Sequence, residues 1–288
     1  MKPFEYYAPE TLEAAVEIMA RYEEGIYPVA GGTDLIPKMR YGQIQPKVVV
    51  NLKRIPGLAE IVPQDDGSLK IGALATLTQV ASSPEVRERY PMVAQIAGKM
   101  ASVPVRNLAT VGGNLCNAAP SADLAPPLIA LDAEAVIFGP QGERRVPLEA
   151  FFTGPGQTVL GRGELLTAVV VPPPDPQARG TYIKHAHREA LDIAIVGVAA
   201  WVRFEAGGSV CEDARIVLGA VAPTPIRARE AEAAIRGAPL TEERIAEAGR
   251  LAAEAARPID DVRGSAWYRR EMVAVLTRRA LLSVITSQ

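Results

Sequence analysis

The chain has 288 residues, a formal net charge of −2 and 48% hydrophobic residues, which is the composition of an ordinary globular protein of two or three domains. It lacks a basic block, so nucleic acid is not an expected partner. The longest apolar run, residues 193–202, is too short to span a membrane. The first residues lack the apolar core of a secretion signal, and we expect a cytoplasmic protein or one exported only with a partner.

Cysteine and histidine are scarce. The two cysteines, Cys116 and Cys211, are too few for an iron–sulfur cluster, which usually takes four thiolates, and the cytosol disfavours a disulfide between them. His185 and His187 alternate along a strand-like stretch and therefore share one face. Because no further ligand accompanies them, the pattern predicts no metal site.

The beginning of the chain alternates strand and helix patterns. Thr11 is placed to cap a helix that runs to about Tyr22. A shorter helix is expected over residues 35–41, and strands are expected at residues 3–7, 27–30 and 47–52. This order predicts a small, mainly parallel α/β lobe over residues 1–56.

A second, α+β lobe is predicted over residues 57–176. Three helices are expected in it: one begins at Thr78, and the other two cover residues 90–101 and 123–131. Its expected strands cover residues 69–73, 134–138 and 165–171. A stiff, extended proline-rich linker at residues 172–176 closes it.

A third domain is predicted over residues 177–288. Strand patterns at residues 181–184, 193–204 and 214–222 predict a three-stranded antiparallel sheet. Two helices follow, from near Thr241 and Ser265. In the second helix, Tyr268, Met272, Val275 and Leu276 are expected to face the core.

Two glycine-rich segments carry the functional signal. One is Ala30-Gly31-Gly32-Thr33-Asp34, and the other is Thr110-Val111-Gly112-Gly113-Asn114, which Asp123 follows. Paired glycines allow φ > 0 and let a ligand approach the main chain closely, and exposed N–H groups form concave sites for phosphate oxygens. The two segments together predict a long bipartite ligand, held from two sides by N–H groups of residues 31–35 and 112–114.

Neither segment matches a Rossmann fingerprint or a P-loop. In order, the two segments resemble the FAD loops of the FAD-binding subunit of the molybdenum hydroxylases. This is the family of xanthine dehydrogenase, aldehyde oxidase and bacterial carbon monoxide dehydrogenase. The resemblance covers essentially the whole chain, and the layout is most similar to the separate medium subunit of the carbon monoxide dehydrogenase type.

The resemblance implies FAD as the cofactor and a set of contacting residues. In the first loop these are Val29, Ala30, Gly31, Gly32, Thr33, Asp34 and Leu35, in the second Thr110, Gly112, Gly113 and Asn114, and beyond them Asp123, Leu165, Leu166 and Lys184. Asp123 is expected to accept from a ribityl hydroxyl or the flavin imide, and the two leucines are expected to form an apolar wall for the ring. Lys184 is expected either to stabilise the anionic reduced flavin or to pair with a carboxylate. No catalytic or metal residue is expected.

Structural alternatives stand beside these assignments. The glycine pairs also suit simple turns, and Asp123 also suits a helix N-cap. Leu165 and Leu166 also suit ordinary strand core, and Lys184 a solvated strand position. Met100, near which relatives place a residue close to the cofactor, also suits the core face of a helix.

The function expected from the resemblance is electron transfer. A large partner would oxidise the substrate at a molybdenum cofactor, and a small partner would pass electrons through two [2Fe–2S] clusters to FAD on this chain. NAD, oxygen or a quinone would then take the electrons. Some relatives of the carbon monoxide dehydrogenase type carry an aromatic residue after the aspartate that aligns with Asp192. Here Ile193 follows, as in the xanthine dehydrogenase type, which leaves the acceptor open. The chain also lacks the cysteine-bearing insertion of a reductase branch.

Two other functions are weighed. A self-sufficient flavin oxidase or reductase of the same superfamily would need acid–base groups for its substrate, and residues 177–288 offer none. Covalent-flavin oxidases of that kind often carry histidine in the first loop, where this chain has Thr33. A cofactor-free scaffold is disfavoured by the intact glycine, threonine, asparagine and aspartate positions.

Overall fold

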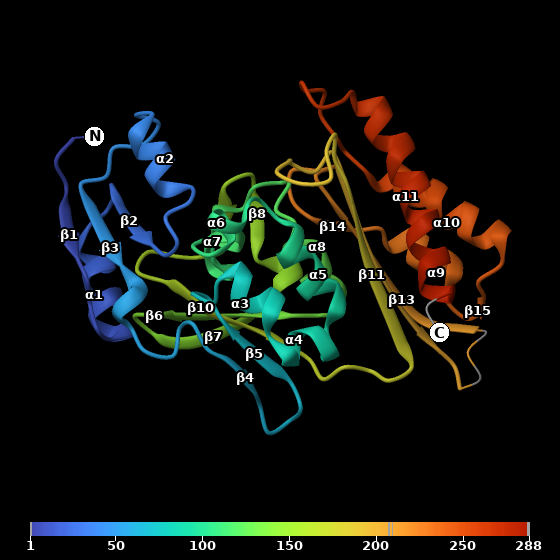
Figure 1. Ribbon diagram of the computed structural model, residues 1–288, viewed down its shortest axis with the longest axis horizontal. Coiled ribbons are helices and arrows are strands. Elements are labelled where there is room, and N and C mark those ends of the chain that lie inside the picture. Colours follow the sequence, from blue (N-terminus) through green and yellow to red (C-terminus); the bar gives the residue numbers. More distant parts are fainter. Residues whose placement is uncertain (1, 207, 209, 287–288) are drawn as a thin grey trace.

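A computed structural model describes residues 2–206, 208 and 210–286, whose three main sheets follow one another along the molecule (Figure 1). The N-terminal unit contains β1, Glu5–Tyr7, β2, Ile26–Val29, and β3, Val48–Asn51, with β3 in the middle and parallel to both neighbours. Thr11 caps α1, Leu12–Arg21, by accepting from the N–H of Ala14, and α2, Leu35–Arg40, follows β2. The expected small parallel α/β lobe is therefore confirmed.

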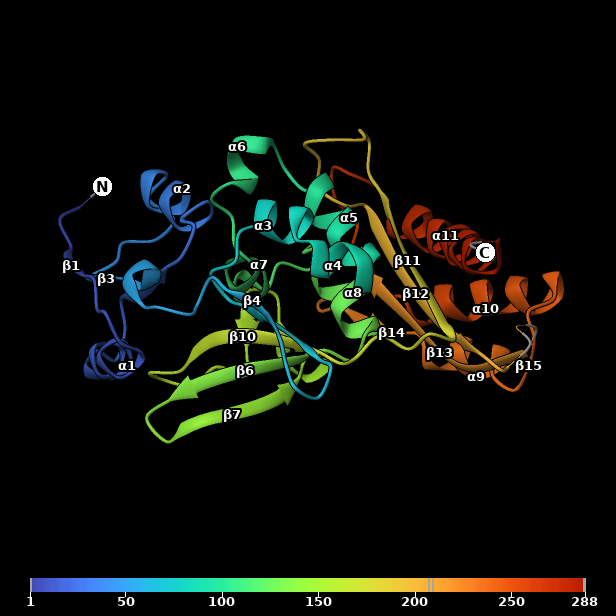
Figure 2. The same ribbon diagram turned by 60° about the horizontal axis from the view of Figure 1, so that its bottom comes forward.

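The central unit is an antiparallel sheet in the order β4-β5-β10-β6-β7, with helices over one face (Figure 2). β10, Leu165–Val171, is buried along its whole length because it lies in the middle of this sheet. The other strands are β4, Ile61–Pro63, β5, Leu69–Gly72, β6, Glu134–Gly139, and β7, Gly142–Pro147; β8, Phe152–Gly154, and β9, Gln157–Thr158, form a small separate pair. The helices are α3, Leu77–Ser82, α4, Pro84–Arg89, α5, Pro91–Lys99, α6, Val103–Arg106, α7, Val111–Asn117, and α8, Ala125–Ala130.

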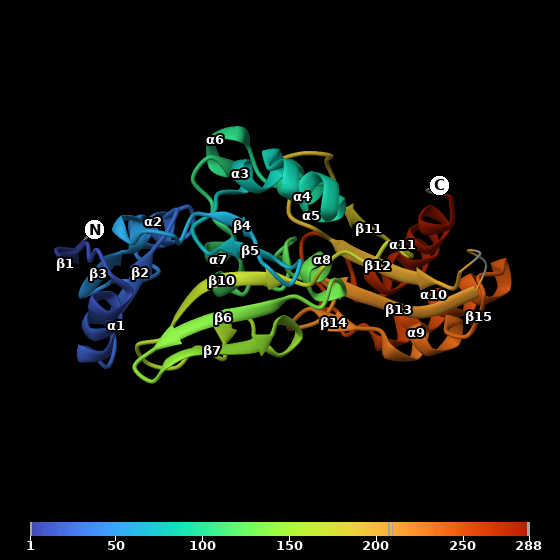
Figure 3. The same cartoon turned by 90° about the horizontal axis from the view of Figure 1, so that it is seen from below.

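The C-terminal unit packs on the far side of α8 and α5 (Figures 1 and 3). Its antiparallel sheet consists of β11, Ala178–His185, β12, Val196–Phe204, and β13, Val210–Gly219. Two short strands, β14, Ile226–Arg227, and β15, Ala238–Pro239, add to β13. The helices α9, Arg229–Ile235, α10, Glu242–Ala255, and α11, Ala266–Thr286, cover the outer face. The expected antiparallel sheet followed by two long helices is confirmed.

β12 explains the longest apolar run of the sequence. Val198, Ala200 and Val202 pack against the C-terminal helices, whereas Ala199 and Trp201 point into the core of the central unit. A strand buried on both faces has no polar alternation, because successive side chains point to opposite faces.

Several elements differ from expectation. The helix expected from Thr78 begins at Leu77, because Thr76 and Gln79 form a capping box. Short strands such as β4 and β7, and the helices α4 and α7, were not expected. α7 is the important omission, because it contains the second glycine pair and glycine is a poor helix former.

The core face expected for α11 is only partly correct. Leu276 is buried as expected, and Tyr268 and Met272 pack partly buried against the core, but the helix also buries Arg269 and Val273, which were not expected. The Arg269 guanidinium donates to the carbonyls of Ile195 and Ala220 at 2.7 and 3.0 Å and to Asp261 at 2.7 Å. A buried charge with several partners is tolerated inside the protein, and periodicity of apolar residues does not reveal it.

Arg215 of β13 joins the C-terminal and central units. Its guanidinium lies 4.1 Å from the Trp201 ring centroid, donates to the carbonyl of Ala130 at 3.1 Å and pairs with Asp132 at 2.5 Å. Arg229 crosses the same interface to Glu149 at 2.6 Å, but 63% of its side chain is exposed, against 16% for Arg215.

We therefore expect Arg215→Ala to lower the free energy of unfolding by about 2–4 kcal/mol, from the lost cation–π contact and charged hydrogen bonds. Arg229→Ala is the matched control and should change stability much less, because exposed ion pairs contribute little. Chemical denaturation of both variants measures the difference. Equal effects would contradict the role of Arg215 at this interface.

Candidate functional site

The two glycine segments meet where the N-terminal unit faces α6 and α7 (Figure 2). A Cβ on Gly31 would lie 1.9 Å from the carbonyl oxygen of Leu108, just before the second segment. No side chain fits in that space, so Gly31 is required by the close approach of two backbones. The sequence-predicted ligand contacts from residues 29–35 and 110–114 are thereby brought together.

The first segment offers unused donors. Gly32 has φ +74°, and within the described residues no N–H of residues 31–35 donates to a protein acceptor. Val29, Ala30, Thr33 and Leu35 are half-buried, and Asp34 is exposed. A turn that leaves consecutive N–H groups free is the backbone arrangement that binds anions.

The second segment differs from expectation because it is the first turn of α7. The N–H groups of Gly112, Gly113 and Asn114 donate to Ala73 O, Thr110 Oγ1 and Thr110 O at 2.7, 3.0 and 3.0 Å. The expectation that these three N–H groups are free for phosphate is therefore wrong. A Cβ on Gly112 would lie 2.7 Å from the Cβ of Ala73, so this glycine serves packing of α7 on the end of β5.

Two features of α7 remain open to a ligand. A Cβ on Gly113 would meet only the Thr110 hydroxyl, at 2.9 Å. The Oδ1 atom of Asn114 is buried and has no hydrogen-bond partner in the described part of the chain. Buried acceptors are normally paired, so this buried, unpaired amide oxygen is what a bound polar ligand would satisfy.

A polar bridge joins α2 to α7. Lys38 Nζ donates to Asn117 Oδ1 at 2.7 Å, and Asn117 Nδ2 donates to Asp34 Oδ1 at 3.4 Å. Lys38 and Asn117 were not among the predicted site residues. Their signal in the sequence is weak, because only the spacing of Asp34 and Lys38 on one helical face hints at a shared partner.

Asp123 is buried and paired. It is 5% exposed and accepts from the Tyr182 hydroxyl at 3.0 Å and from Lys184 Nζ at 2.8 Å. The N-cap of α8 is Leu124, so the interpretation of Asp123 as a helix cap is wrong. Burial raises the pKa of the Asp123 carboxyl, and the Lys184 charge and the two hydrogen bonds oppose that rise.

Lys184 pairs with a carboxylate, one of its two expected roles. It also donates to the carbonyl of Asp192 at 2.8 Å, which fixes the connection between β11 and β12. Because Tyr182 and Lys184 alternate on β11, both reach Asp123 from one face of the strand. The contact between the Tyr182 hydroxyl and Asp123 was not expected, because the two residues are 59 positions apart in the sequence and no local pattern connects them.

Leu165 and Leu166 do not share one wall. They are adjacent on β10 and point to opposite faces, Leu165 into the cluster with Val48 and Leu74 and Leu166 into the core of the central unit. Each is at most 5% exposed. Met100 likewise lies in the core of the central unit.

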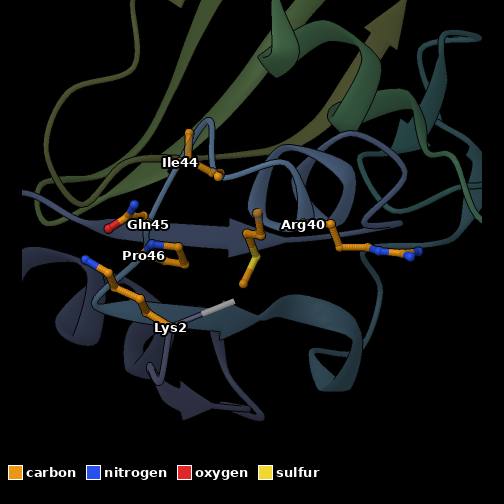
Figure 4. A pocket seen from close by; sticks show the side chains of 7 residues that line it. Lys2, Arg40, Ile44, Gln45 and Pro46 are labelled. Carbon is orange, nitrogen blue, oxygen red and sulfur yellow. The ribbon is translucent and has the colours of Figure 1, made fainter.

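A cavity of about 270 Å³ lies between the central and C-terminal units. Pro120 and Ser121, which shortly precede Asp123, line it together with Ile193 and with Arg257 and Arg263 from the segment before α11. A second hollow, of about 260 Å³, lies on the N-terminal unit between Lys2, Arg40, Ile44, Gln45 and Pro46 (Figure 4). None of the predicted cofactor residues lines the second hollow.

The described ranges contain no group of three or more histidine, cysteine, aspartate or glutamate side chains placed to hold an ion. His185 Nε2 lies 2.9 Å from the Tyr268 hydroxyl, and Cys116 and Cys211 are free thiols. A search of the same ranges for a helix able to cross a bilayer finds none.

Comparison with known proteins identifies the family. Residues 2–174 match the FAD-binding domain in molybdopterin dehydrogenase, and residues 181–284 match the carbon monoxide dehydrogenase flavoprotein C-terminal domain. The chain belongs to this family of FAD-binding oxidoreductase subunits, with FAD as its cofactor. The expected family and fold are thus confirmed.

Relatives that match over almost their full length include FAD-binding subunits of xanthine dehydrogenase and medium chains of carbon monoxide dehydrogenase. The chain is 32% identical over 283 residues to a putative xanthine dehydrogenase FAD-binding subunit of Escherichia coli K12, covering 98% of this chain and 96% of that protein. It is 33% identical over 279 residues to the carbon monoxide dehydrogenase medium chain of Hydrogenophaga pseudoflava, covering 96% of each. A solved carbon monoxide dehydrogenase structure from that organism superposes with a TM-score of 0.94 at 34% identity, covering 99% of this chain and 98% of that chain.

The contact between the glycine segments generates a prediction. Gly31→Ala should lower the free energy of unfolding by about 3 kcal/mol, because its Cβ would overlap the Leu108 carbonyl oxygen. Gly98→Ala, in α5, is the control, since its Cβ would meet Ala81 at an ordinary 3.6 Å. That substitution should stabilise the protein by about 0.5–1 kcal/mol through helix propensity. Equal melting temperatures for Gly31→Ala and wild type would contradict the close approach.

Proposed function

We propose that this chain is the electron-transfer flavoprotein subunit of a molybdenum hydroxylase. A small partner carrying [2Fe–2S] clusters delivers electrons to FAD, and a large partner carrying the molybdenum cofactor oxidises the substrate. The observation that carries the proposal is the full-length match, in order, to both domains of the family. The relatives named as medium chains or FAD subunits support separate partners.

When bound, FAD supplies the redox chemistry, and the chain supplies binding, orientation and charge. The free N–H groups of residues 31–35 are proposed to donate to the pyrophosphate. The unpaired Asn114 Oδ1 accepts a hydrogen bond from the cofactor, and Gly113 leaves room for close approach. A carboxylate has about four acceptor sites, and Tyr182 and Lys184 occupy two of those on Asp123. The remaining sites are proposed to accept a hydrogen bond from the cofactor.

The remaining predicted contacts, Val29, Ala30, Thr33, Asp34, Leu35, Thr110, Leu165, Leu166 and Lys184, stay part of the proposal. Thr110 contributes by capping α7. Lys184 contributes a positive charge that Asp123 partly neutralises. The burial of the two leucines favours a structural contribution, in which β10 supports the site from beneath.

The acceptor is proposed to approach through the cavity beside Pro120, Ser121 and Ile193. Arg257, Arg263 and Arg269 line this cavity with Asp261, which pairs with the last two of these arginines. The lining therefore keeps an excess of positive charge, which suits an anionic acceptor such as NAD better than a neutral quinone or oxygen. The aliphatic Ile193 leaves more room there than an aromatic residue would.

The division into residues 1–56, 57–176 and 177–288 is retained as the proposed domain organisation. A cytoplasmic location is also retained, and it rests on the two thiols, which are free in the structure.

The decisive experiment is native affinity purification of the chain, followed by subunit masses and a count of molybdenum, iron and flavin. We expect one larger and one smaller partner, with all three present. The reduced complex is then mixed in turn with NAD, oxygen and a quinone, and reoxidation of the flavin is followed by absorbance. A flavin-bearing chain without partners or metals would instead indicate a self-sufficient flavoenzyme, and a chain without flavin a scaffold.

The open side of Gly113 gives a sharper test. Gly113→Val should reduce flavin content at least tenfold, because its side chain would enter the proposed cofactor space. The same change at Gly112 is the matched control, and it should mainly lower the melting temperature of the apoprotein, since its Cβ meets Ala73 at 2.7 Å. Full flavin content in Gly113→Val would refute the assignment of the second segment.

A further inference from the structure

The space beside Gly197 of β12, where a side chain would lie, is filled by the side chain of Tyr182. A Cβ there would lie 2.3 Å from the Tyr182 hydroxyl oxygen and 3.0 Å from its Cζ. Gly197 lies opposite Lys184 in the sheet, and Tyr182 is the next residue of β11 on the same face. The phenol therefore crosses diagonally over β12 through the space that Gly197 leaves, which we call the Gly197 slot.

The slot directs the phenol towards Asp123. Tyr182 donates to Oδ1 of Asp123 at 3.0 Å while Lys184 donates to Oδ2 at 2.8 Å, so each carboxylate oxygen has one partner from β11. These bonds cross the interface between the central and C-terminal units. Gly219 is paired with Gly197 in the sheet. A Cβ on Gly219 would lie 2.8 Å from the Pro126 ring, so the absence of a side chain lets α8 pack closely on the same face of the sheet.

We propose that Tyr182, seated in the Gly197 slot, is a positioning residue of the FAD site, which orients the Asp123 carboxylate so that its remaining acceptor positions face the cofactor. This inference rests on the proposed function, because it takes Asp123 as a cofactor contact. Lys184 alone does not fix the carboxylate, because a single ammonium contact leaves rotation about the Cβ–Cγ bond free. The second bond, from the phenol, removes that freedom.

The same geometry affects the charge of Asp123. The titratable groups that act on it are Lys184 and Tyr182, and both lower its pKa against the rise that burial causes. Removing the Tyr182 hydroxyl should therefore raise the pKa of Asp123 further. A protonated Asp123 no longer pairs with Lys184 as an anion, so its contribution to cofactor binding is lost as pH falls, and is lost at a higher pH in the variant.

The test compares Tyr182→Phe with Gly197→Ala. The chain is purified with its accompanying subunits, stripped of FAD and titrated with FAD by fluorescence between about pH 5 and 8. Tyr182→Phe should weaken FAD binding about tenfold at pH 7, because FAD binding must then supply the orientation of the Asp123 carboxylate that the phenol provides in the wild type. Gly197→Ala should cause a similar loss with the tyrosine intact, because its methyl group expels the phenol. The double variant should be little weaker than either single variant, since both break one interaction.

Tyr90→Phe is the matched control. Tyr90 is also buried, 1% exposed, but its hydroxyl donates to the carbonyl of Pro172 at 2.6 Å, in the connection between β10 and β11. It should lower the melting temperature and leave both the dissociation constant of FAD and its pH profile unchanged. If Gly197→Ala does not accumulate, Tyr182→Phe, which keeps the ring, carries the comparison.

The outcomes separate the two proposals. Wild-type affinity and pH profile in Tyr182→Phe would overturn the positioning role while leaving the proposed function intact. A wild-type complex that contains no FAD would overturn both. We expect Tyr182→Phe to bind FAD more weakly than wild type and to lose FAD affinity at a higher pH as the solution is acidified. Tyr90→Phe should show neither change.

Discussion

The three units of this protein meet where glycines allow the backbone or a ring to come unusually close. Gly31 of the N-terminal unit faces the Leu108 carbonyl of the central unit, and Gly219 of the C-terminal sheet faces the Pro126 ring of α8. In each case a Cβ would fall within 3 Å of a neighbouring atom. The relative placement of the units depends on these contacts, because a side chain at either of them would separate surfaces that together form the proposed cofactor site.

A second constraint is the cost of burying charge. Asp123 lies almost out of reach of solvent, and an unpaired carboxylate there would be strongly unfavourable. Lys184 and Tyr182 satisfy it from β11, and Lys184 in turn fixes the Asp192 carbonyl. One buried carboxylate thus links the central unit, the C-terminal sheet and the connection beside the cavity.

The proposed division of labour among subunits accounts for the chemical groups that the described residues present. Under this proposal the chain only relays electrons and needs no substrate pocket with acid–base groups. It needs a held cofactor, a side on which a donor approaches and a side on which an acceptor approaches. The described residues present backbone donors, one buried carboxylate and few titratable side chains at the proposed site. These groups suit a member of this family that binds FAD and has no substrate chemistry of its own.

The sequence by itself determined the family and the cofactor, through the resemblance of its two glycine segments to known FAD loops. It also determined the parallel first lobe and the antiparallel C-terminal sheet, because these follow from local patterns of alternating strands and capped helices. Only the tertiary structure decided that the second glycine pair begins a helix with occupied N–H groups, that Leu165 and Leu166 face opposite ways, and that Tyr182 reaches Asp123 through the Gly197 slot. The physical reason is that hydrogen-bond partners and close contacts join residues far apart in the chain, and local periodicity carries no information about which distant group fills a given space.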